Sequence, residues 1–284
     1  MSGRRLSVTR GSPSTRAGER LAARRKSKRR RAAIALGVLF LLLCGAVVYG
    51  FQQEAVRISD IQVFGASQSF ADIARAAMRG NYLGLIPRNS TFFFPASSIR
   101  ANIIAAHPDV AAVALFRSGL TGLSVKVDER IPIATWCPPS FAGAGSIASS
   151  TATTGCYLFD ADGFIYATTS AARPLNSFIV YEPLATSGGD PIGSTLPNAA
   201  KLPTTFDFAR QLATFGSPVS AIVFGTDNEV DDYLASGTRV TYILGNEQTA
   251  FAALTSAQAD FNLADGSVDY VDLRFDGKIY LKKK

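Results

Sequence analysis

The sequence has few of the residues that carry common catalytic and metal-binding chemistry. Its 284 residues include one histidine, three cysteines, two methionines and one tryptophan. The single histidine, His107, has no second imidazole to share a zinc ion and no neighbouring Ser or Cys to form a triad. A phosphate-binding glycine loop and the HExxH and GxSxG motifs are also absent. We therefore expect no catalytic residue, metal site or cofactor, and a protein that is not an enzyme.

Two acidic clusters remain as candidates for chemistry. Asp160 and Asp162 flank one residue, and a longer run, DNEVDD, covers 227–232. The longer run has the one, three, five spacing of a calcium loop, but Asp232 stands where that loop needs glycine and Thr238 where it needs glutamate. We expect this run to be solvated acidic surface.

One long uncharged segment organises the chain. Residues 32–51 (AAIALGVLFLLLCGAVVYGF) carry no charge, and a helix of that length spans about 30 Å, the thickness of a bilayer core. A cleaved signal peptide has a shorter apolar region and ends at a small-x-small site, which is missing here. A lipoprotein cleavage box at 41–44 would need a smaller residue than Leu43 before Cys44. The segment therefore predicts an uncleaved, single-pass transmembrane helix.

Charge sets the expected orientation of this helix. Residues 1–31 contain ten Arg and two Lys against one acid, whereas the rest of the chain contains 17 basic and 21 acidic residues. The positive-inside rule places the basic tail, which we expect to be disordered, in the cytoplasm and residues 52–284 outside. The run RRKSKRRR at 24–31 could contact nucleic acid, but its position beside the membrane favours anionic lipid. We expect no nucleic-acid partner.

Two cysteines bracket a low-complexity loop of Pro, Gly, Ala, Ser and Thr. Cys137 and Cys156 would lie in an oxidising exterior, where a disulfide can persist. Such a bridge would close a loop of about twenty residues and contribute about 3 kcal/mol in the chain-entropy model. The alternative is a pair of unpaired thiols that flank the loop by chance.

Residues 57–130 predict five elements in the order strand, helix, helix, strand, strand. Apolar spacing places them at 58–65, 67–80, 96–106, 110–117 and 123–130. The loop at 81–95 contains an aromatic run, Phe92 to Phe94. We expect that run to pack into the core rather than to contact a partner or the membrane.

Residues 131–284 predict a mixed α+β domain with a mainly antiparallel sheet. Turn signals such as DADG at 160–163 and DG at 276–277 separate short apolar strands. Strands are expected at 131–136, 156–159, 164–168, 178–181, 219–224, 230–234, 239–244, 268–275 and 278–281, and helices at 204–215 and 247–263.

This layout resembles the FtsQ/DivIB family of bacterial cell division proteins, in which the strand–helix–helix–strand–strand module is the POTRA domain. No single motif carries the resemblance, which rests on several short stretches in the family's order. They are 58–65, 107–113, 127–134 (VDERIPIA), 157–164 (YLFDADGF) and 270–280 (YVDLRFDGKIY). The Cys-bracketed loop and the short C-terminus depart from the family's pattern.

The resemblance implies a cytoplasmic tail at 1–31, a transmembrane helix at 32–51, a POTRA domain at 57–130 and an FtsQ-type β domain at 131–284. It also implies a non-enzymatic scaffold in the inner membrane at the division septum, linking septum assembly to peptidoglycan synthesis. Family members bind FtsB/FtsL coiled-coil proteins and other divisome membrane proteins, largely through the last strands of the β domain. Carried over by position, the FtsB-binding residues are Tyr270, Asp272, Arg274, Phe275, Gly277, Lys278 and Tyr280.

The residues of this stretch are compatible with a sheet edge. Val271, Leu273 and Phe275 alternate with polar or aromatic neighbours, so one face is expected to pack inward. A strand near the chain end is expected at the edge, where its free N–H and C=O groups can accept a partner strand. The alternative is an ordinary edge hairpin guarded by charged side chains. For the whole protein, the alternatives are a POTRA-containing export component and a membrane-tethered cell-wall enzyme.

Overall fold

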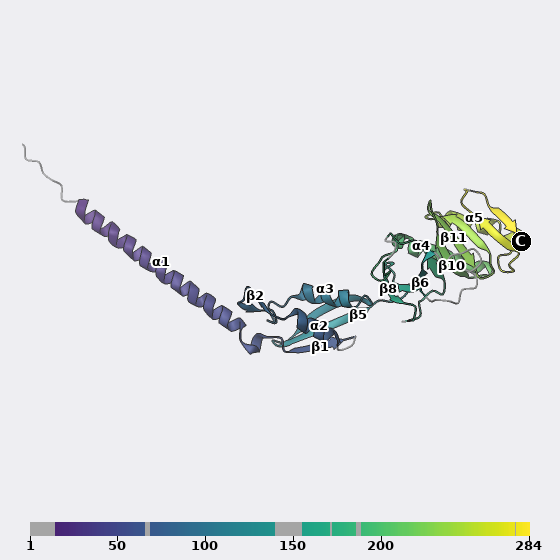
Figure 1. The fold of residues 1–284 in the computed structure, drawn as a ribbon. Helices are drawn as coiled ribbons and strands as arrows, with labels where there is room; N and C mark the ends of the chain where they lie inside the picture. The colour runs from purple at the N-terminus through teal and green to yellow at the C-terminus, as the bar shows by residue number, and fades with distance from the viewer. Residues whose placement is uncertain (1–14, 66–68, 140–154, 171, 186–188, 276) are drawn as a thin grey trace, which may run out of the picture. The chain divides into compact units, whose positions relative to one another are not determined.

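The computed structural model describes residues 15–65, 69–139, 155–170, 172–185, 189–275 and 277–284 (Figure 1), with the backbone alone at 15–27. Most of the loop between Cys137 and Cys156, the first part of the basic tail and Asp276 therefore lie outside the described residues. The described chain is a mixed α+β protein with one long N-terminal helix and a large sheet.

The long helix α1 (Thr15–Phe51) extends well beyond the predicted membrane segment. Within it, Lys28–Phe51 is a 24-residue stretch that is long and apolar enough to cross a membrane, and none of it is buried in the protein. The expected disorder of the tail is wrong for residues 15–31, which are helical. Arg, Lys, Ala, Glu and Leu dominate there and favour helix, and extending an existing helix avoids the cost of nucleation.

A three-stranded sheet with two helices follows in the order that the sequence predicts. The elements are η1 (Glu54–Val56), β1 (Asp60–Phe64), α2 (Ser69–Ala77), α3 (Ala96–Ala106), β4 (Val110–Ser118) and β5 (Gly122–Glu129), and the sheet order is β1-β5-β4. The helix at 96–106 is confirmed to the residue. Hydrogen-bonded pairing puts the last strand of the module between the other two, which the sequence did not indicate.

The loop at 81–95 contains a small hairpin that the sequence reading missed. Strands β2 (Asn81–Tyr82) and β3 (Ile86–Pro87) pair antiparallel. The expected core packing of the aromatic run is wrong for Phe92 and Phe93, which are about half exposed. Their rings instead meet the ring of Phe51 at the end of α1.

The rest of the chain builds one nine-stranded sheet in the order β14-β13-β12-β11-β10-β9-β6-β7-β8. Its strands are β6 (Ala134–Cys137), β7 (Tyr157–Phe159), β8 (Ile165–Thr168), β9 (Ile179–Tyr181), β10 (Val219–Phe224), β11 (Glu229–Leu234), β12 (Arg239–Ile243), β13 (Val268–Asp272) and β14 (Tyr280–Lys283). Five neighbouring pairs are antiparallel, and three are parallel: β6 with β9, β9 with β10, and β12 with β13. The sheet is therefore mainly antiparallel, as expected, and the parallel pairs β9–β10 and β12–β13 arise because the helices α4 and α5 lie between these strands in the chain.

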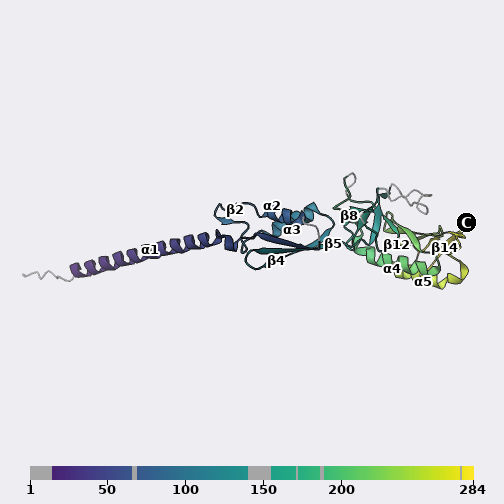
Figure 2. The same cartoon turned by 90° about the horizontal axis from the view of Figure 1, so that it is seen from below.

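Two helices, α4 (Leu202–Leu212) and α5 (Glu247–Ser256), cover one face of this sheet (Figure 2). Short 3-10 turns, η3 (Ala199–Lys201), η4 (Ala213–Phe215) and η5 (Gln258–Asp260), flank them. Phe206, Phe208 and Leu212 of α4 pack with Leu254 of α5 on the apolar face of the sheet in one core. The predicted helix at 247–263 is shorter in the structure, because an irregular segment follows its 3-10 turn.

The chain divides into two compact units whose border does not coincide with residue 130. The first contains the described residues up to 63 together with 69–99 and 115–125, and the second contains the remainder. The predicted domain limits at 57–130 and 131–284 stay predictions.

The acidic run at 227–232 is only partly the solvated surface that the sequence suggests, since Asp227 and Asn228 are exposed and Asp232 is not. Asp232 lies on β11 with 0% of its surface exposed, and neither carboxylate oxygen has a hydrogen-bond partner among the described residues. Strand alternation is the reason, since Val230, Asp232 and Leu234 all face the core. Burial, followed by the nearby charges of Asp231 and Glu247, raises the pKa of Asp232 well above its usual value.

Replacing Asp232 by Asn is expected to stabilise the protein at pH 8. A raised folded-state pKa means that the folded chain keeps a proton which the unfolded chain releases, so stability is lost as pH rises above the unfolded value near 4. Asn needs no proton to be neutral when buried, so the variant should gain about 2 kcal/mol in the free energy of unfolding at pH 8 and less at pH 5. Urea denaturation at both pH values measures this. The exposed Asp227→Asn variant is the control, and an equal effect of Asp232→Asn at both pH values would contradict the assignment.

Candidate partner-binding site

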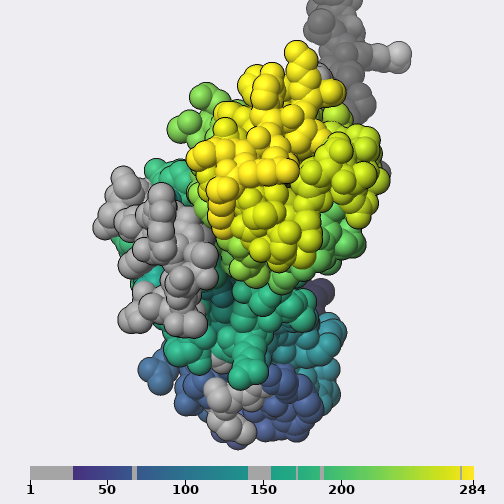
Figure 3. All heavy atoms as spheres, turned by 90° about the vertical axis from the view of Figure 1, so that its right-hand side faces the viewer, coloured from purple at the N-terminus to yellow at the C-terminus, as the bar shows by residue number. Residues whose placement is uncertain are grey.

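The C-terminal strands form one end of the nine-stranded sheet. Strand β13 pairs with β12 on one side and with β14 on the other, so β14 is the edge strand. The expectation that 270–280 itself supplies the edge is therefore wrong for β13, because the chain turns back after Asp272 and adds one more strand outside it. The C-terminal residues, yellow in Figure 3, lie together at the surface of the second unit.

The alternation predicted for 270–275 stops where β13 ends. Asp272 is buried although it was expected to face solvent, whereas Phe275 is 51% exposed although it was expected to face the core. Strand periodicity holds only while the backbone stays extended. Beyond Asp272 the chain leaves the strand, and Phe275 turns outward.

Arg274 fixes this turn to the sheet. Its Nε and Nη2 donate to the two carboxylate oxygens of Asp272 at 2.9 and 2.6 Å, and its Nη1 donates to Glu229 of β11 at 2.6 Å. The side-chain hydrogen bonds from Arg274 lower the pKa of Asp272 despite its burial. The two ion pairs therefore connect the turn to two different strands.

Two exposed aromatic rings lie next to these ion pairs of Arg274. The rings of Phe275 and Tyr280 meet edge to face with centroids 5.2 Å apart, and the guanidinium of Arg274 lies 5.8 Å from the Phe275 ring. Tyr280 is 49% exposed. Aromatic side chains in contact with each other and half exposed are typical anchors for a partner surface.

Strand β14 itself carries a basic surface. Lys282 donates to Asp269 at 2.7 Å, and that hydrogen bond lowers the pKa of Asp269. Tyr270 lies between two cations, with Arg239 and Lys282 at 5.6 and 5.9 Å from its ring. Exposed lysines continue along the segment at Lys278, Lys283 and Lys284.

The structure brings together all the described residues that the sequence predicted for this site. Asp272, Arg274, Phe275 and Tyr280 are linked through the contacts above, and Tyr270 lies on β13 opposite Lys282 of β14. Gly277 and Lys278 lie exposed in the turn before β14. The sequence prediction missed Lys282 and Lys283, because it ended the last strand at Leu281 whereas β14 continues to Lys283. The run of lysines was the available signal, since lysine is common on edge strands.

The opposite end of the sheet is less open. Strand β8 is also terminal, but the segment around Ser194 covers its start, where Ile165 donates to Ser194 O at 2.9 Å and Gly193 donates to Ile165 O at 2.8 Å. Among the described residues, no such backbone contact covers the outer side of β14. We therefore place the candidate partner site at the β14 edge.

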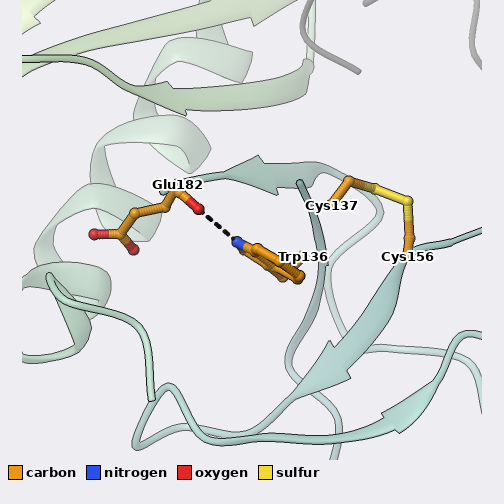
Figure 4. Close-up of a disulfide and its surroundings, with 4 residues drawn as sticks. All are labelled: Trp136, Cys137, Cys156 and Glu182. Carbon is orange, nitrogen blue, oxygen red and sulfur yellow. Dashed lines mark hydrogen bonds between the residues drawn. A yellow bond between two sulfur atoms is a disulfide. The ribbon is translucent and has the colours of Figure 1, made fainter. Parts of the chain in front are cut away.

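The structure joins Cys137 and Cys156 in a disulfide between neighbouring strands (Figure 4). Both residues are buried and pack with Tyr181 and Ala221. On the other side of β6, Trp136 donates from its indole N–H to the Glu182 carbonyl at 2.9 Å. The disulfide thus connects the end of β6 to the residue before β7, near the β8 end of the sheet and distant in the strand order from the β14 edge.

The described residues hold no group of three or more potential metal ligands close together. No protein-family model matches the chain. No curated protein matches it either.

Proposed function

We propose that this chain is a non-enzymatic division scaffold of the FtsQ/DivIB type, anchored in the inner membrane with its basic end in the cytoplasm. Residues 52–284 then lie outside the membrane and bind FtsB/FtsL-like coiled-coil proteins at the septum. Through them, the scaffold links septum assembly to peptidoglycan synthesis. The open β14 edge with its fixed aromatic pair is the observation that carries this proposal.

The order of the elements in the N-terminal half of the chain also supports the proposal. The apolar stretch of α1 is compatible with a single membrane span. The strand–helix–helix–strand–strand order of β1, α2, α3, β4 and β5 is the order expected of a POTRA domain. Both features match the resemblance of the sequence to FtsQ/DivIB.

Strand addition is the binding mode that the proposed site favours. A partner strand would pair with the outer backbone groups of β14, and its side chains would contact Phe275 and Tyr280. Because Lys278, Lys283 and Lys284 are exposed along this edge, an acidic partner segment would match it in charge.

A photo-crosslinking amino acid at Lys283 of the full chain tests the proposal in the native membrane. We expect it to capture small single-pass coiled-coil proteins, identified by mass spectrometry. The same amino acid at exposed Gln211 on α4 is the control and should capture none. Capture at Gln211 but not at Lys283 would move the partner site, and failure to recover such a protein from either position would contradict the scaffold function.

A further inference from the structure

The loop between β2 and β3 exposes leucine in an unfavourable backbone conformation. Leu83 is 97% exposed and has φ of 50°, and Gly84 follows with φ of 73°. A branched apolar residue rarely adopts a left-handed conformation, for which Gly and Asn are the usual choices. Packing against the described residues does not explain a leucine here, and a contact outside the chain would.

This loop belongs to a larger apolar surface, which we call the collar. It consists of Leu83, Leu85, Phe92 and Phe93, all about half exposed or more. Four large apolar side chains grouped in this way are unusual on a surface that faces only water.

The collar touches the end of α1. The Phe51 ring lies 5.2 Å from the Phe93 ring and 6.1 Å from the Phe92 ring, centroid to centroid. The amide of Gln52 donates to the Leu85 carbonyl at 3.4 Å. Both views show β2 next to this end of the helix (Figures 1 and 2).

The length of α1 sets the height of the collar relative to a bilayer. The uncharged segment 32–51 ends at Phe51, and its helix spans about 30 Å, the thickness of the hydrocarbon core. Phe51 would therefore lie at the outer interface, where aromatic side chains concentrate. Side chains in ring contact with Phe51 must lie at the same level.

Four arginines lie beside the β2–β3 hairpin. Arg57, Arg75 and Arg79 line a cavity of about 520 Å³ next to the hairpin. Arg75 is paired with Asp72 at 2.8 Å, the guanidinium of Arg88 lies 5.4 Å from the Tyr82 ring, and Arg79 is exposed. Guanidinium groups at this level can bind the phosphates of anionic lipid headgroups.

We propose that the collar docks on the outer surface of the bilayer, inserting Leu83, Leu85, Phe92 and Phe93 while the arginines bind anionic phospholipid headgroups. This rests on the membrane anchoring in the proposed function. It makes the first compact unit a membrane-surface module, held against the lipid rather than swinging freely from the helix.

The test places an environment-sensitive fluorophore at the collar of the full chain. Cys44→Ser removes the free thiol, and Leu83→Cys then provides one labelling site while the Cys137–Cys156 disulfide stays oxidised. In nanodiscs of equal phosphatidylcholine and phosphatidylglycerol, we expect doxyl-labelled lipid to quench this fluorophore several-fold. A label at Leu175, an exposed leucine of the second unit, should be quenched little.

Two further comparisons separate the parts of the proposal. Replacing Arg79 and Arg88 by Gln should reduce quenching at position 83 in the mixed lipid. For the protein that keeps both arginines, quenching at position 83 should be weaker in pure phosphatidylcholine than in the mixed lipid. Equal quenching in all these cases would overturn the headgroup role. An unquenched label at position 83, together with a quenched label at Val38 inside the apolar stretch, would overturn docking while keeping the anchor. Failure to quench at Val38 as well would overturn the anchor itself.

Discussion

Replacing Phe275 and Tyr280 together by alanine is expected to weaken binding of an FtsB/FtsL-like partner about 100-fold. Their rings are half exposed, contact each other and lie beside the β14 edge. A buried aromatic anchor at the centre of an interface is typically worth about 2 kcal/mol, and neighbouring anchors do not add fully, which gives the two orders of magnitude. Titration of the purified full chain with the partner measures the affinity.

Three variants control this experiment. Phe116→Ala removes an exposed ring from β4 and should leave the affinity unchanged. Tyr280→Phe keeps the ring and should retain most of the affinity. Thermal unfolding should differ little between the double variant and the wild type, because both rings are partly solvated in the free protein. Wild-type affinity of the double variant would exclude these rings from the interface.

Removing the disulfide is expected to lower the free energy of unfolding by about 3 kcal/mol. Cys137 and Cys156 are 19 positions apart, and opening that loop restores chain entropy to the unfolded state. For a domain of this size, the loss corresponds to about 6–12 °C in Tm. The variant is Cys137→Ala with Cys156→Ala, and calorimetry of the full chain in detergent is the measurement.

Cys44→Ala provides the matched control for the disulfide. Cys44 is a free, exposed cysteine of α1, so its loss should leave unchanged the Tm of the second unit, which contains the disulfide. The wild type in reducing agent should resemble the double variant. Two free thiols in non-reducing mass spectrometry of the wild type, or an unchanged Tm in the double variant, would contradict a stabilising bridge.

Local sequence signals predicted most of the secondary structure. The meander of β10, β11 and β12 follows from short apolar runs separated by turn residues, and the DADG turn between β7 and β8 was confirmed as an antiparallel hairpin. The position of α3 follows from its apolar spacing and the His107-Pro108 stop. These signals act over a few residues, so the sequence shows them directly.

Strand ends were harder to predict, and the candidate site depended on one of them. The apolar alternation of 271–275 continues beyond the last strand residue, and only the turn after Asp272 decides that Phe275 is exposed. Arg274 holds that turn through Glu229, 45 positions earlier in the chain. A contact of such sequence separation leaves no local pattern.

The sequence by itself determined the long apolar helix, the mixed α+β class and the short C-terminal strands with their aromatic and charged residues. Each follows from periodicity, charge or turn chemistry within a few residues of one place. Only the tertiary structure decided that β14 rather than β13 is the edge, that Asp232 is buried, and that Phe51 meets Phe92 and Phe93. The physical reason is the same in all three cases. Strand order, burial and ring contacts depend on which distant segments pack together, and that is set by the whole core rather than by any one stretch.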